Sequence, residues 1–171
     1  AATRAIWPHG FELRYSVRLQ PGGLQLALAV TNTGAQPLSF TGALHTYLAV
    51  EAIEQARLAG LGGQPEWDAV RDVHGTCAET IAPSGEFDRV YEAAVTPLLL
   101  SDGASRLQIT QSTSLADAVV WNPGAARCNQ LADMPPDGYR QMLCVEAANV
   151  WAPIGVAPGA RWQGWQELRL A

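Results

Sequence analysis

Regular alternation of apolar and polar residues constrains the fold of this chain more than any other feature. Two stretches have an apolar residue at every second position, namely Phe11, Leu13, Tyr15, Val17 and Leu19, and then Leu24, Leu26, Leu28 and Val30. A period of two places such side chains on one face of a strand, which predicts two half-buried strands. The segment Gln20-Pro21-Gly22-Gly23 stands between them and favours a tight turn, so we expect an antiparallel hairpin.

The rest of the chain continues this pattern in short segments. Asn32-Thr33-Gly34 predicts a second turn, and further strands are predicted at 38–49, 54–59, 77–82, 88–94, 97–101, 105–111, 117–121, 141–147 and 162–169. We expect one short helix at about 125–132. The turn-rich segment 61–76 is predicted to be a loop that either lines a site or only connects strands. This pattern predicts an all-β fold, an antiparallel β-sandwich formed by a single domain over residues 1–171.

Composition and charge narrow the choice of partner and compartment. A net charge of −5 and the absence of lysine disfavour a nucleic acid or an anionic membrane as partner. Cysteines at 77, 128 and 144 include no C-x-x-C pair, which fits neither a disulfide framework nor a zinc site. The sequence has no apolar run of the roughly 20 residues that a membrane-spanning helix needs. We therefore expect a cytoplasmic protein with no nucleic acid and no membrane partner.

Two strand-like segments carry residues suited to proton transfer. His45 lies between apolar neighbours in 40–47, where a buried imidazole needs a partner; taken alone, a hydrogen-bonded core histidine is the simpler interpretation. Glu146 ends an apolar run in 142–149, where burial would raise its pKa towards that of a general base. The alternative for Glu146 is a strand-end position with the carboxylate in solvent.

Two other segments carry polar residues at strand ends. Asp88 and Arg89 are adjacent in 86–91, so in a strand they point to opposite faces and serve different partners. The alternative is an aspartate in a turn and an arginine at the surface. Trp121 and Asn122 precede Pro123, which ends the strand. An indole face suits the C–H surface of a sugar, although a tryptophan in a strand is more often part of the core.

Taken together and in this order, the segments resemble the hexose-6-phosphate mutarotases (glucose-6-phosphate 1-epimerases) of the aldose 1-epimerase superfamily. The resemblance covers nearly the whole chain and rests on segments at 7–13, 32–34, 40–47, 86–91, 119–123 and 144–146. It implies a galactose-mutarotase-like supersandwich. Family members carry a substantial portion before the Trp7-Pro8-His9 segment, which supplies strands and most of the phosphate-binding basic residues. We therefore expect this chain to be the C-terminal part of the family domain. Leu48 and Gly124 replace usual aromatic residues of the family, which predicts local differences in the pocket.

The resemblance also implies roles for individual residues. His45 would donate a proton to the ring oxygen of an aldohexose or hexose 6-phosphate, while Glu146 removes the proton of the anomeric hydroxyl. Asp88 would hold sugar hydroxyls. Further contacts with the sugar are expected from His9, Trp121 and Asn122. Ring opening by one acid and one base needs no metal and no cofactor.

Two alternatives to a mutarotase stay open. One is a catalytically inert, sugar-binding sandwich of the same family. The other, less favoured, is a glycoside hydrolase in which Glu146 and Asp88 form the carboxylate pair. Outside these segments, His74 is expected to lie in a loop, and the three cysteines are expected to be structural.

Overall fold

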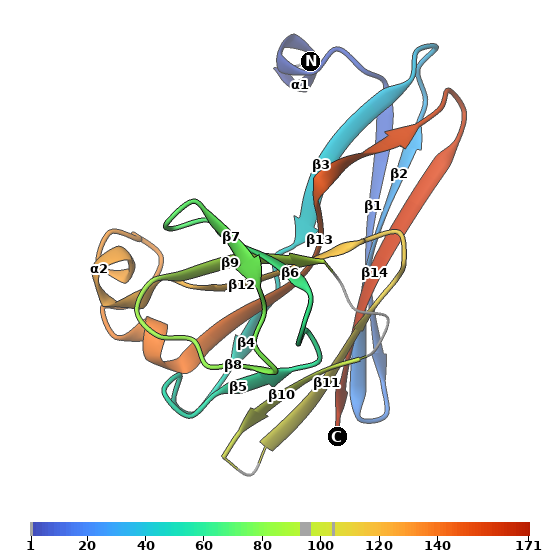
Figure 1. The fold of residues 1–171 in the computed structure, drawn as a ribbon. Helices are drawn as coiled ribbons and strands as arrows, with labels where there is room; N and C mark the ends of the chain where they lie inside the picture. The colour runs from blue at the N-terminus through green and yellow to red at the C-terminus, as the bar shows by residue number, and fades with distance from the viewer. Residues whose placement is uncertain (1, 93–96, 104) are drawn as a thin grey trace.

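The computed structural model describes residues 2–92, 97–103 and 105–171, which form two antiparallel sheets (Figure 1). In spatial order, the first sheet contains β1 (Phe11–Gln20), β2 (Gly23–Asn32), β14 (Arg161–Leu170), β11 (Ser105–Gln111), β10 (Leu98–Asp102), β5 (Arg57–Ala59) and β8 (Thr80–Ile81). The second contains β3 (Leu38–Leu44), β13 (Met142–Val156), β12 (Asp117–Asn122), β9 (Phe87–Glu92), β6 (Pro65–Asp68) and β7 (Val73–Thr76), and β4 (Tyr47–Ala49) also pairs with β13. Three short helices are α1 (Ala2–Ile6), α2 (Gly124–Cys128) and the 3-10 helix η1 (Gly138–Gln141).

The hairpin predicted at the start of the chain is confirmed. β1 pairs with β2 in a register that ends at Gln20 opposite Gly23, and Gly22 adopts the positive φ of 69° that a tight turn requires. The prediction that both strands are half-buried is wrong for β1. Its apolar residues Leu13, Tyr15, Val17 and Leu19 are 57–82% exposed. Alternation shows that a strand has an apolar face, but not whether another layer covers that face.

Several predicted boundaries also need correction. The strand predicted at 38–49 is divided at His45 and Thr46 into β3 and β4. The segment 61–76 is not a loop, since it contains β6 and β7, and His74 therefore lies in a strand. The strands predicted at 54–59 and 77–82 shorten to β5 and β8, the helix at 125–132 becomes α2, and residues 93–94 of the strand predicted at 88–94 lie outside the described residues.

The main hydrophobic core lies between the two sheets. Leu58, Leu100 and Ile109 reach it from the first sheet, while Leu143 and Val145 reach it from β13. Cys144 and Glu146 point to the other face of β13, because successive side chains of a strand point to opposite sides. In the part of the chain that the structure describes, no helix is long and apolar enough to cross a membrane.

Candidate active site

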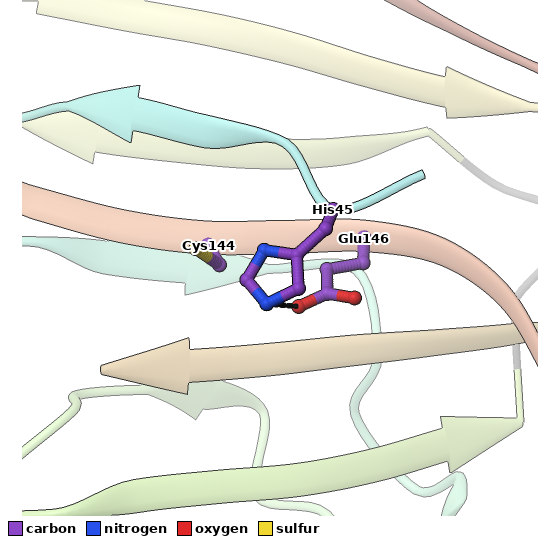
Figure 2. A group of neighbouring side chains, drawn as sticks. All are labelled: His45, Cys144 and Glu146. Carbon is purple, nitrogen blue, oxygen red and sulfur yellow. Dashed lines mark ion pairs between the residues drawn. The ribbon is translucent and has the colours of Figure 1, made fainter. Parts of the chain in front are cut away.

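His45 and Glu146 meet where β3 ends and β4 begins. Leu44 pairs with Ala147 and Tyr47 pairs with Cys144, so the two residues between them bring His45 opposite Glu146. The chain leaves the ladder at this point, and the imidazole projects over β13 (Figure 2). The Nε2 atom of His45 lies 3.2 Å from Oε1 of Glu146. The sequence-predicted pair is therefore in direct contact.

The two partners differ in exposure and so in their electrostatics. The side chain of His45 is 49% exposed, whereas that of Glu146 is only 5% exposed. Burial is the main cause that raises the pKa of Glu146 from its ordinary 4.5 to about 7, and the nearby carboxylate of Asp88 adds to the effect. The pKa of Asp88 is itself raised, chiefly by burial and then by Glu86. A carboxylate with a pKa near neutrality can both accept and return a proton at physiological pH.

Aromatic side chains surround the imidazole of His45. Tyr47 stacks on it with ring centroids 5.0 Å apart, and Trp121 meets it edge-on at 5.6 Å. Trp121 pairs across the strands with Asp88 on one side and with Cys144 on the other. Directly paired residues share a face of the sheet, so Asp88 and Trp121 belong to the same surface as the His45–Glu146 pair. Tyr47 was not predicted as a site residue, although it follows His45 by the two positions that keep strand residues on one face.

A buried glutamine supports the pair from the other sheet. Gln166 on β14 is fully buried. Its Oε1 atom accepts a hydrogen bond from Thr46 Oγ1 at 2.6 Å, and its Nε2 atom donates to the carbonyl of Val145 at 2.9 Å. These partners are the chain neighbours of His45 and Glu146, so Gln166 fixes both backbone segments. The sequence signal for Gln166 was a polar residue at an inward position of the strand predicted at 162–169.

Two of the residues predicted to contact a sugar lie elsewhere. Asn122 is 1% exposed, and its amide donates to the carbonyls of Tyr139 and Met142 and accepts from the backbone of Gly124. It therefore fixes the chain where β12 ends. His9 lies against the ring of Trp7, with centroids 5.0 Å apart, in the segment before β1.

Arg89 lies beside Asp88 but serves a different role. Its guanidinium binds Glu66 at 2.6 Å and Asp68 at 2.9 Å, and its side chain is 20% exposed. Arg89 is thus a partly buried link between β9 and β6. The expectation that adjacent residues serve different partners agrees with this arrangement.

Cys144 completes a group of possible metal ligands with His45 and Glu146, whose donor atoms lie within 4.8 Å of one another (Figure 2). Burial, and then the carboxylate of Glu146, raise the pKa of the Cys144 thiol. A thiol that stays protonated is a poor metal ligand. The group is therefore better suited to proton transfer between His45 and Glu146 than to holding a cation.

Comparisons with known proteins place this geometry in context. The family model described as aldose 1-epimerase matches residues 1–169. A protein of Cenchrus ciliaris with the provisional name glucose-6-phosphate 1-epimerase is 36% identical over 165 residues, which are 93% of this chain and 50% of that protein. A protein of Escherichia coli K12 with the same provisional name is 31% identical over 153 residues, which are 85% of this chain and 49% of that protein. The chain thus spans about half the length of these curated relatives. A provisionally assigned mutarotase from Salmonella typhimurium superposes with a TM-score of 0.89 at 26% identity, covering 99% of this chain and 57% of that one.

Proposed function

This chain belongs to the aldose 1-epimerase family, and we propose that it interconverts the α and β anomers of an aldohexose by acid–base ring opening and closure. The observation that carries this proposal is the contact between the exposed imidazole of His45 and the buried carboxylate of Glu146. Such a pair can deliver one proton and remove another at the same time.

The proposed reaction begins with two proton transfers at the sugar. Protonated His45 donates a proton to the ring oxygen, and ionised Glu146 removes the proton of the anomeric hydroxyl. The bond between C1 and the ring oxygen breaks as the C1 carbonyl forms. After rotation about the C1–C2 bond, His45 takes back a proton from the C5 hydroxyl and Glu146 returns one to the carbonyl oxygen. The protein ends in its starting protonation state.

The surroundings of the pair support these roles. The Nε2 and Oε1 atoms are 3.2 Å apart, so the ring oxygen and the anomeric hydroxyl of one sugar, which are neighbours on C1, can reach both groups by replacing this contact. The pKa of Glu146, raised to about 7, suits a base that must also return its proton. Asp88 lies on the same face and is proposed to accept hydrogen bonds from sugar hydroxyls. Trp121 and Tyr47 are proposed to pack against the ring.

Hexose 6-phosphate is the first substrate to test, because both curated relatives are named for it. An inert sugar-binding protein is the second candidate. It is favoured by one observation, namely that the chain spans about half the length of those relatives.

Anomer exchange measured by magnetisation-transfer NMR tests the proposal. Glucose 6-phosphate, glucose and galactose are each compared with the chain, with Glu146→Gln and without protein. We expect acceleration by the chain that Glu146→Gln abolishes. The matched control is Glu12→Gln, because the carboxylate of Glu12 is 60% exposed on β1. Binding without acceleration would select the inert alternative, and cleavage of a glycoside would select a hydrolase.

A further inference from the structure

Three aromatic side chains from separate strands form a cluster on the second sheet. The rings of Trp67 on β6 and His74 on β7 stack with centroids 6.1 Å apart and planes 14° apart. Trp151 on β13 lies 5.8 Å from Trp67 and 5.7 Å from His74. Trp151 is 44% exposed, and His74 is exposed as well. None of these three residues has a role in the proton transfers described above.

The cluster shares a face of the sheet with the acid–base pair. The strand register aligns His74 with Trp67, and then continues in one row through Val90 and Val119 to Glu146. Directly paired residues point to the same side. Three strand spacings separate Trp67 from Glu146, which is about 14 Å between their backbones. This span is longer than one pyranose ring and is suited to two.

Backbone irregularities hold the two tryptophans in place. Trp67 Nε1 donates to Asp72 Oδ1 at 3.0 Å. Asp72 has a φ of 54°, a left-handed conformation that no other non-glycine residue in the described segments adopts. Such a conformation costs free energy and often accompanies function.

Trp151 lies in the irregular part of β13, where the register with β3 shifts between Asn149 and Ile154. The carboxylate of Asp117 fixes this irregularity by accepting hydrogen bonds from the backbone of Val150 at 2.6 Å and of Trp151 at 3.0 Å. Irregularities of this kind redirect side chains near binding sites. Hydrogen bonds therefore fix the indole of Trp67 and the backbone that carries Trp151.

The charges near the cluster disfavour an anionic ligand. The carboxylate of Asp72 accepts a hydrogen bond from Trp67. The guanidinium groups of Arg71 and Arg89 bind the buried Asp68 at 3.6 and 2.9 Å, and Asp68, which follows Trp67 in β6, points to the opposite face. An exposed aromatic surface beside the Asp72 carboxylate suits the C–H face of an uncharged sugar, which needs no counter-ion.

We propose that Trp67, His74 and Trp151 form a second subsite that binds a neutral pyranose ring, so that a reducing disaccharide places its anomeric end against His45 and Glu146. The placement of the anomeric end at His45 and Glu146 rests on the proposed function. Binding of a pyranose ring to the aromatic subsite does not require ring opening.

Isothermal titration calorimetry tests the subsite without any turnover. Maltose, cellobiose, glucose and glucose 6-phosphate are titrated into Glu146→Gln, which retains the aromatic cluster. We expect at least one disaccharide to bind more tightly than glucose. We expect Trp151→Leu, and separately Trp67→Leu, to weaken that binding about threefold to tenfold, the range that aromatic contacts contribute. Glucose and glucose 6-phosphate should be affected less than twofold.

Val73→Ala is the matched control, because Val73 is exposed on the same hairpin and points to the opposite face. Disaccharides that bind no better than glucose, or binding that survives both tryptophan substitutions, would overturn the proposal. Circular dichroism of each variant checks that the fold is intact. Tight disaccharide binding without anomer exchange in the unsubstituted chain would leave the subsite standing and remove the proposed function instead.

Discussion

The burial of Glu146 affects both the proposed proton transfer and the stability of the folded chain. Because the pKa of Glu146 is raised from 4.5 to about 7, the folded chain holds more protons than the unfolded chain between these values. The free energy of unfolding therefore falls by about 3 kcal/mol in total as the pH rises from 4.5 to about 7. Ionisation of Glu146 should increase the rate of anomer exchange over the upper part of this pH window.

The expected result is a rate of anomer exchange that rises with pH up to about 7, while the free energy of unfolding falls between pH 4.5 and pH 7. Urea unfolding and NMR exchange at matched pH values measure both. Glu146→Gln should lose this part of the pH dependence of stability. If stability rose over that window and the substitution left the slope unchanged, the assignment of the raised pKa to Glu146 would be wrong.

Gln166 acts on the pair through its neighbours. Gln166→Leu keeps the volume but removes the hydrogen bonds to Thr46 and Val145. We expect a stability loss of about 1–3 kcal/mol from the buried groups left unpaired, and a tenfold to hundredfold loss of exchange rate, roughly the cost of misplacing reacting groups. A purely structural role would lower stability but leave the rate per folded molecule and its pH profile unchanged. Gln163→Leu, at an exposed position of the same strand, should be nearly neutral.

At the scale of elements, alternation predicts β1, β2 and β14, because each of them has ten residues and so enough positions to show a period of two. β13 was predicted only over 141–147, although it extends to Val156. Alternation fails for β6 and β7, which have only four residues each. Pairing with β9, which is distant in the sequence, fixes β6, and β7 pairs with β6. Gln166 was missed for the same reason, since its partner Thr46 is 120 positions away. The antiparallel sandwich, predicted from the strand pattern and also implied by the family resemblance, is confirmed.

The start of α2 depends on Gly124. Gly124 has a φ of 62°, and a Cβ atom there would lie 2.6 Å from the backbone of Gly85 and Glu86. Gly124→Ala should therefore destabilise the chain by about 2–4 kcal/mol, through strain and overpacking. Urea unfolding measures this loss. Gly155→Ala meets no atom within 4 Å and should change stability by less than about 0.5 kcal/mol. Equal stabilities for the two variants would contradict this account of α2.

At the scale of the whole molecule, β1 exposes an apolar face to solvent. It forms the edge of its sheet and exposes Leu13, Tyr15, Val17 and Leu19. An exposed edge with an apolar face is a template for pairing with another strand. The sequence of β1 is also self-complementary. In an antiparallel pair of two copies centred on Tyr15, Leu13 would face Val17 of the second copy, and Glu12 would face Arg18.

We therefore expect the chain to associate with a second copy through β1. Light scattering coupled to size exclusion should give a mass that rises with protein concentration towards that of a dimer. Replacing Leu13 and Val17 by lysine should restore a monomer, because directly opposed like charges destabilise a strand pair. Arg14→Gln, which changes a charge on the other face of β1, should leave the association intact. A single monomeric mass for the unsubstituted chain at all concentrations would show instead that the twist and charge of β1 are enough to keep this edge unpaired.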